Sequence, residues 1–256
     1  MEITAAIRKN IRSLADARHR RESGLFLAEG SKCVLDTLPH FRCRMLAATR
    51  NWAESHPAEF AAHDGAIASR ADMERMSSLS TPAQVLAVYE IPAHDIPDAE
   101  TLSRGLVIAL DRIQDPGNLG TIIRVADWMG VHDIIASQDT VDVYNPKVVQ
   151  ATMGSISRVR VHYTDLADKL RELSAAVPVY GTLLDDKAEN IYTASLPSQA
   201  VLVMGNEGNG VSDAVRKLLS HTLFIPPYPP GADTAESLNV AVATAIALAQ
   251  FRRQNF

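Results

Sequence analysis

The sequence has little of what marks disulfide-rich or metal-binding proteins. Only two of its 256 residues are cysteines. Cys33 and Cys43 form neither a CxxC pair nor a metal-ligand spacing, so we expect reduced, partly buried thiols. The eight histidines are scattered, without an HxxxH or HxH pair. We therefore expect no structural zinc and no other metal site.

Long apolar runs are also missing. The longest candidate, residues 240–249, is far shorter than the roughly 20 residues that span a bilayer. The first four residues lack the basic-then-apolar layout of a signal peptide. Both absences point to a cytoplasmic protein that does not enter a membrane. Apolar residues still make up 46% of the chain, which is enough for a sizeable core.

The charge is distributed unevenly along the chain. Its net value is −5, yet residues 1–50 hold ten basic and five acidic side chains. That segment is therefore positive and the remainder is strongly negative. Such asymmetry indicates contact with nucleic acid. Taken alone, the same feature also fits a solvated basic helix face.

A boundary between two domains is expected in residues 91–98, where two prolines and several polar residues disfavour regular structure. We therefore predict one domain over residues 1–96 and a second over residues 97–256. In the first, apolar spacing predicts a basic helix over 3–22 and a short helix over 31–38. Strands are expected at 24–30, 45–48, 66–68 and 85–89.

In the second domain, apolar runs alternate with helical patterns. The runs lie at 106–110, 133–136, 159–163, 177–183, 200–204 and 223–225. The helical patterns lie at 119–129, 147–155, 166–176, 214–219 and 240–250. Buried strands separated by helices predict an α/β domain with a largely parallel sheet. Because such sheets bind ligands beyond the carboxyl ends of their strands, the loops that follow the runs are the candidate site.

Three of these loops carry unusual residues. In residues 111–118, Pro116-Gly117 supplies a turn and Asn118 can cap the following helix, which carries Arg124 among apolar neighbours. Residues 204–210 hold three glycines that allow close backbone approach to a ligand. Glu207 within them would repel a pyrophosphate, so it suits either a cationic side chain or a neutral or positively charged ligand. The third loop, residues 225–239, is stiffened by four prolines and leads into an Ala-rich helix.

Together the three loops resemble the three motifs of the SpoU/TrmH branch of the SPOUT methyltransferases. Residues 118–126 (NLGTIIRVA) resemble the N-x-G-x-x-x-R-x-A motif, and residues 203–210 (VMGNEGNG) resemble the motif with G-x-E-x-x-G. Ile225-Pro226 with residues 237–243 (SLNVAVA) resembles the third motif. Residues 9–14 and 20–30 are similar, less specifically, to the small α/β RNA-binding domain that precedes many of these enzymes.

The resemblance implies a fold with a trefoil knot at its C-terminal end, an S-adenosylmethionine cofactor bent into that knot, and a homodimer built through the C-terminal domain. It implies methylation of a ribose 2'-hydroxyl in ribosomal or transfer RNA. The residues that match the family's catalytic positions are Asn118, Arg124, Glu207, Ser237 and Asn239. Those that match its cofactor contacts are Thr182, Gly205, Ile225 and Leu238.

The role of Arg124 stays open between two accounts. The family mechanism often uses this arginine as the base for the 2'-hydroxyl. The pKa of a free arginine lies far above neutral pH, so an uncharged arginine near pH 7 would cost about 7 kcal/mol. A charged arginine that binds the adjacent phosphate and stabilises oxyanion charge is physically easier. Either way, we expect the helix to carry Arg124 towards Glu207 and Asn239.

Three other functions fit parts of the pattern. One is methylation of an RNA base by the same fold, and another is an RNA-binding protein without activity. A nucleotide-dependent dehydrogenase is a more distant alternative, since the glycines do not match GxGxxG. The residues alone do not identify which RNA, or which nucleotide, is modified.

Overall fold

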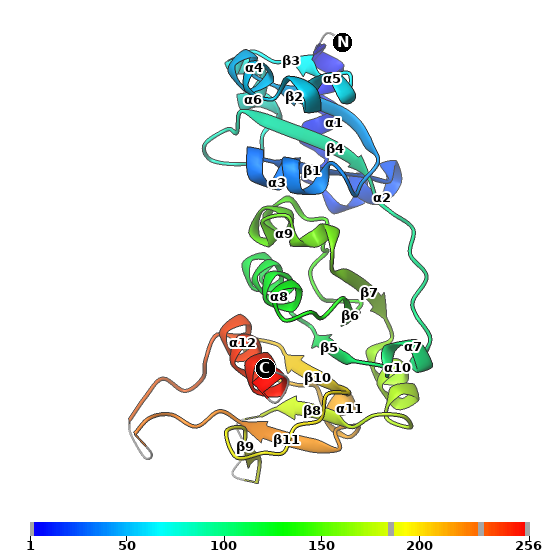
Figure 1. Ribbon diagram of the computed structural model, residues 1–256, viewed down its shortest axis with the longest axis vertical. Coiled ribbons are helices and arrows are strands. Elements are labelled where there is room, and N and C mark those ends of the chain that lie inside the picture. Colours follow the sequence, from blue (N-terminus) through cyan, green and yellow to red (C-terminus); the bar gives the residue numbers. More distant parts are fainter. Residues whose placement is uncertain (1–2, 184–186, 230–232, 254–256) are drawn as a thin grey trace. The chain divides into compact units, whose positions relative to one another are not determined.

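The chain forms two compact units in the computed structural model (Figure 1). One unit contains Met1–Ala93 and Asp142–Ser157, and the other contains His94–Val141 and Arg158–Phe256. The structure describes residues 3–183, 187–229 and 233–253. The first two residues of the chain and residues 230–232 of the proline-rich loop lie outside the described part.

The first unit is built on a four-stranded sheet in the order β1-β4-β2-β3. Strands β1 and β2 both run antiparallel to β4, and β3 runs parallel to β2. The strands are β1 (Leu25–Glu29), β2 (Cys43–Ala48), β3 (Ala66–Ile67) and β4 (Val85–Glu90). The helices are α1 (Ala5–Ser13), α2 (Ala17–Ser23), α3 (Ser31–Thr37), α4 (Arg50–Ser55), α5 (Pro57–Ala62), α6 (Arg70–Met76) and α9 (Pro146–Thr152), followed by the 3-10 helix η1 (Ser155–Ser157).

The single helix predicted over residues 3–22 is wrong. The chain forms α1 and α2 with a break between them, because the Asp16 side chain accepts a hydrogen bond from the His19 backbone N–H and starts a new helix. The apolar spacing that suggested one helix is still used, since Ile11 and Leu14 on α1 and its C-cap are buried.

The segment Asp142–Ser157 packs within the first unit although its neighbours in sequence belong to the second. The main polar contact that holds this segment in the unit is made by Arg20, which is only 1% exposed. Its Nε (3.0 Å) and Nη2 (2.5 Å) atoms both donate hydrogen bonds to Asp142 Oδ2. Arg20 also donates to the carbonyl oxygens of Leu14 and Ala15. This buried guanidinium therefore joins two segments that are distant in sequence.

Removing Arg20 should destabilise the first unit. Arg20→Ala leaves Asp142 and two carbonyl groups without their donor, and breaking a buried pair is costly. Because the Asp142 side chain is 34% exposed and can be hydrated, we expect a loss of about 2–3 kcal/mol in the free energy of unfolding. Urea denaturation measures it. The control Arg18→Ala removes an exposed pair with Glu22 and should cost less than about 0.5 kcal/mol. Equal losses of unfolding free energy in the two variants would contradict the stabilising role assigned to Arg20.

The second unit contains a seven-stranded sheet in the order β7-β6-β5-β10-β8-β11-β9, and every neighbouring pair is parallel. The strands are β5 (Leu106–Asp111), β6 (Asp133–Ser137), β7 (Arg160–Thr164), β8 (Val179–Thr182), β9 (Glu189–Asn190), β10 (Ala200–Gly205) and β11 (His221–Phe224). All six residues of β5 are buried, as expected for a central parallel strand. The predicted parallel α/β sheet is therefore confirmed.

Helices surround this sheet, and two of them begin where candidate loops end. They are α7 (Ala99–Leu102), α8 (Pro116–Trp128), α10 (Leu166–Leu173), α11 (Asp213–Arg216) and α12 (Val240–Arg252). Helices α8 and α12 lie side by side (Figure 1). Arg252 on α12 donates to the carbonyl oxygens of Met129 and Gly130 just beyond α8. The ends of both helices are therefore tied together.

The cysteines are buried to different degrees and unpaired. Burial raises the pKa of Cys33 to about 11 and that of Cys43 to about 11, so both stay protonated thiols at neutral pH. Among the residues that the structure describes, no cluster of three or more His, Cys, Asp or Glu side chains could hold a metal ion. None of the helices in the described part of the chain is long and apolar enough to cross a bilayer.

Candidate active site

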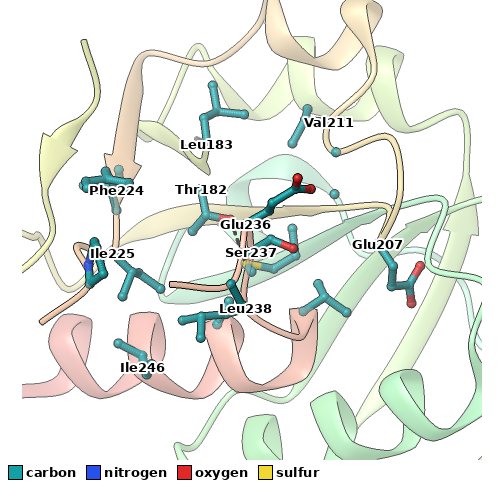
Figure 2. Close-up of a pocket in the computed structure, with 18 of the residues that line it drawn as sticks. Thr182, Leu183, Glu207, Val211, Phe224, Ile225, Glu236, Ser237, Leu238 and Ile246 are labelled. Atoms are coloured by element: carbon teal, nitrogen blue, oxygen red, sulfur yellow. Dashed lines mark hydrogen bonds between the residues drawn. The ribbon is translucent and has the colours of Figure 1, made fainter. Parts of the chain in front are cut away.

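A cavity of about 960 Å³ lies at the carboxyl ends of β8, β10 and β11 in the second unit. Its wall contains the four residues predicted to contact the cofactor, which are Thr182, Gly205, Ile225 and Leu238. Figure 2 shows Thr182 at the end of β8, Ile225 just after β11 and Leu238 just before α12. Two of the three candidate loops, residues 204–210 and 225–239, thus share one cavity, as expected for the carboxyl edge of a parallel sheet.

The lining of the cavity is mostly apolar with a few charges. Among the described residues, the charged side chains that line it are Glu207, Glu236 and Arg216. Two carboxylates beside apolar walls suit a ligand with a flat apolar ring and a positive charge. S-adenosylmethionine has both features, in its adenine ring and its sulfonium, so the residues present fit this cofactor.

Gly205 allows the backbone to close tightly at the edge of the cavity. A Cβ atom built at this position would lie far inside van der Waals distance of the backbone of Gly210 and Val211. The loop is closed there by two backbone hydrogen bonds between Asn206 and Gly210, of 3.0 and 2.9 Å. Because the obstructing atoms are backbone, they cannot move aside as a flexible side chain would. The glycine is required by this close approach.

Three of the five predicted catalytic residues form one hydrogen-bonded chain. Asn239 Nδ2 donates to Asn118 Oδ1 (2.8 Å), and Asn118 Nδ2 donates to Glu207 Oε1 (2.9 Å). The Asn239 Oδ1 atom accepts from the backbone N–H groups of Ala241 and Val242, which fixes its amide orientation at the start of α12. All three motifs thus meet through side chains. These hydrogen bonds fix which end of each amide donates and which end accepts.

Asn118 does not cap helix α8, contrary to the expectation above. The helix begins two residues earlier, at Pro116, and Asp115 accepts the capping hydrogen bond from the Asn118 backbone N–H at 2.8 Å. Proline at the first helical position and aspartate before it form a favourable helix start. Since Asp115 takes the cap, the Asn118 side chain is left to bond Glu207 and Asn239.

The other two predicted catalytic residues, Ser237 and Arg124, differ in their position relative to the cavity. Ser237 is exposed and lines the cavity beside Leu238 (Figure 2). Arg124 is exposed on α8, does not line the cavity, and forms no hydrogen bond or ion pair with any described residue. Six residues of helix place it about 120° around the axis from Asn118. The expected approach of Arg124 to Glu207 and Asn239 is therefore not seen within one chain.

Some cavity residues were not singled out from the sequence. Tyr192 follows β9, Arg216 ends α11, and Ile246 lies on α12, and all three line the cavity. These residues lie outside the glycine- and proline-rich loops. Their place in the cavity wall therefore depends on how separate segments of the chain pack together. Asn206 had a local signal, since an Asn before Glu and Gly favours a turn.

Comparison with known proteins agrees with this geometry. Residues 105–249 match the SpoU rRNA Methylase family, and residues 7–87 match the MRM3-like substrate binding domain. A 23S rRNA guanosine 2'-O-methyltransferase of Bacillus subtilis is 36% identical over 178 residues, covering 69% of this chain and 68% of the relative. A 23S rRNA guanosine 2'-O-methyltransferase of Neisseria meningitidis is 33% identical, covering 77% of this chain and 80% of the relative.

Solved structures extend the similarity to the whole chain. An rRNA methyltransferase from Sinorhizobium meliloti with bound AdoMet, which is S-adenosylmethionine, superposes with a TM-score of 0.85 at 31% identity. That match covers 100% of this chain and 98% of the other. The SpoU methyltransferase AviRb from Streptomyces viridochromogenes, in complex with AdoMet, has a TM-score of 0.82 at 26% identity and 98% coverage of both chains.

Proposed function

The chain belongs to the SpoU rRNA Methylase family, and on that premise we propose that it transfers the methyl group of S-adenosylmethionine to a ribose 2'-hydroxyl of ribosomal RNA. The observation that carries this proposal is the chain of hydrogen bonds from Asn239 through Asn118 to Glu207 beside the cavity. Ribosomal rather than transfer RNA is favoured because the relatives named above act on 23S rRNA.

The residues of the cavity would hold the cofactor and leave room for the RNA. Backbone groups at Gly205, Ile225 and Leu238, with Thr182, all of which line the cavity, would contact the cofactor. When bound, S-adenosylmethionine supplies an electrophilic methyl group on its sulfonium. The protein must then hold the ribose oxygen in line with that methyl group and assist loss of the hydroxyl proton.

The polar residues divide this work. Glu207 keeps one carboxylate oxygen on Asn118, and its second oxygen can accept a hydrogen bond from the ribose. Ser237 and Asn239 flank Leu238, and we propose that they bind the ribose or its phosphate. Arg124, kept charged, would bind the adjacent phosphate through its planar guanidinium and stabilise the negative charge that develops on the attacking 2'-oxygen as its proton is lost.

The first unit supports RNA binding, with fewer free charges than the composition suggests. Arg8 pairs with Asp72, and both Arg42 and Arg44 pair with Glu90. The exposed bases of the first fifty residues that form no ion pair within the described ranges are Lys9, Arg12, Arg21 and Arg50. We propose that residues 1–96 contact the RNA substrate and that residues 97–256 carry out methyl transfer.

Mapping ribose methylation in ribosomal RNA from cells with and without this gene tests the function. We expect one or a few 2'-O-methyl positions to disappear when the gene is deleted and to return when it is restored. Loss of a base methylation instead would favour the alternative reaction of the same fold. Unchanged maps of ribosomal and transfer RNA would contradict the proposal. A cytoplasmic location, where the RNA substrate would be met, and the trefoil knot implied by the resemblance are part of the same proposal.

A homodimer through α8 and α12 would bring Arg124 to an active site. Arg124 shares an exposed stripe of α8 with Thr121 and with Trp128, whose side chain is 87% exposed. Val242 on the adjacent α12 is 49% exposed. Apolar side chains this exposed on two packed helices mark an interaction surface. We propose that a second copy covers it and that Arg124 serves the partner's cavity.

Trp128→Glu should therefore weaken dimerisation. A buried aromatic residue at the centre of an interface is commonly worth about 2 kcal/mol or more, so we expect the dimer dissociation constant to rise at least about 30-fold. Sedimentation velocity across a concentration series measures it. Ile67→Glu, an equally drastic change at a 43% exposed residue of the first unit, should leave the dimer intact. A wild-type monomer at tens of micromolar with full activity would refute the dimer.

A further inference from the structure

Asn206 uses the two ends of its side-chain amide for different purposes. Its Oδ1 atom accepts hydrogen bonds from the backbone N–H groups of Gly208 and Asn209, both at 3.0 Å, and so shapes the loop that carries Glu207. Its Nδ2 atom donates to the Arg112 carbonyl oxygen at 2.7 Å. The oxygen thus organises its own loop, while the nitrogen ties that loop to the one after β5.

Arg112 is held in an unfavourable backbone conformation at this tie. Its φ is 59°, in the left-handed region that a residue other than glycine rarely adopts. The Arg112 backbone N–H donates to Ser137 Oγ at 2.9 Å, and its carbonyl accepts from Asn206. Hydrogen bonds from the ends of β6 and β10 therefore hold this residue from both sides. Asn118 lies six residues after Arg112, in the first turn of the helix that follows this loop.

We propose that Asn206 is a positioning residue for methyl transfer, acting through the Arg112 carbonyl to fix the placement of Asn118 relative to Glu207. The two loops are then joined twice, once by Asn206 to Arg112 and once by Asn118 to Glu207. The first bond sets the spacing of the loops, which lets the second form with correct geometry before RNA arrives. This inference rests on the proposed function, because Asn118 and Glu207 are taken as its reaction-centre residues.

Asn206→Asp separates the two uses of the amide. Aspartate has nearly the same shape and keeps an oxygen for the Gly208 and Asn209 amides, but it places a second oxygen against the Arg112 carbonyl. Because a small misplacement of catalytic groups can cost about 100-fold, we expect kcat to fall about 10- to 100-fold. The dissociation constant for S-adenosylmethionine and the KM for RNA should stay within about threefold. Asn206→Ala, which loses both uses, should also weaken cofactor binding.

One comparison variant makes the result specific. Asn145→Asp is the same chemical change at a helix cap where the side-chain oxygen accepts from the Lys147 N–H, and it should leave kcat, KM and melting temperature unchanged.

Coupling between Asn206 and Ser137 gives a second readout. Both hold Arg112, so Ser137→Ala combined with Asn206→Asp should reduce kcat less than the product of the single effects. Independent, multiplicative effects would overturn the inference. So would a wild-type kcat in Asn206→Asp, or a loss of kcat matched by equal losses in cofactor affinity and melting temperature. Absence of ribose methylation by the wild-type protein would instead overturn the proposed function, and this inference with it.

Discussion

Replacing Arg124 by lysine is expected to lower the rate of methyl transfer about 100-fold or more, while affinity for S-adenosylmethionine changes less than about twofold. Arg124 does not line the cavity of its own chain, and in the proposed arrangement it binds the RNA phosphate rather than the cofactor. Lysine keeps the charge and most of the apolar stem, which would satisfy a residue that only covers an apolar surface. It does not keep the planar fork that binds phosphate and ribose together.

Arg104→Lys is the matched control, because Arg104 lies in the same unit and pairs on the surface with Glu100. It should leave both the rate and the cofactor affinity unchanged. Single-turnover methylation assays and calorimetric titration measure the two quantities. If Arg124→Lys methylates RNA at nearly the wild-type rate, Arg124 is a surface residue and the catalytic assignment is wrong.

Mixed dimers test whether Arg124 acts on the partner's site. We would combine chains carrying Arg124→Ala with chains carrying Glu207→Gln, each inactive alone. If the arginine serves the partner, each mixed dimer contains one complete site and recovers about half of the wild-type activity. If it serves its own chain, both sites stay defective and no activity returns. The second result would contradict the dimer arrangement proposed here.

Gly205→Ala is expected to weaken S-adenosylmethionine binding about 10- to 100-fold, and Gly205→Val should abolish it. The added Cβ would overlap the backbone of Gly210 and Val211, so the loop must shift at the cavity edge. Forced overpacking of this kind commonly costs about 1–3 kcal/mol. Calorimetry in the presence of a chelator measures the affinity and shows that it needs no added metal.

Gly105→Ala is the control for this substitution. Gly105 lies just before β5 in the same sheet, and a Cβ there would meet nothing within 4 Å. We expect unchanged cofactor affinity and melting temperature. Should Gly205→Ala bind the cofactor as tightly as the wild type while remaining folded, the loop does not form the cofactor site.

Much of the fold of the second unit could be predicted because parallel strands buried on both faces leave a strong signal. Strands β5, β6 and β10 coincide with continuous apolar runs, and the turn-rich loops follow them. The first unit was harder. Its helices α4 and α6 were missed because they are short, although Thr49 and Ser69 cap them. The break before α2 was missed although Asp16 is a favourable cap.

Contacts between distant residues left no pattern in the sequence. Arg20 and Asp142 are 122 positions apart, and neither a periodicity nor a turn signal joins them. Asn118 and Glu207 are 89 positions apart, and only the resemblance suggested that they work together. The resemblance also suggested Arg124, but it could not show that the helix directs this side chain away from Asn118. Periodicity describes single elements, whereas the site depends on how separate elements meet.

The most direct test is to incubate the purified protein with S-adenosylmethionine labelled in its methyl group and with ribosomal RNA from cells that lack the gene. The RNA is then digested to nucleosides and separated by chromatography. We expect label in a 2'-O-methylnucleoside, with no label when Glu207→Gln replaces the wild-type protein. Label in a methylated base, or RNA that stays unlabelled while a control methyltransferase modifies the same preparation, would contradict the proposed function.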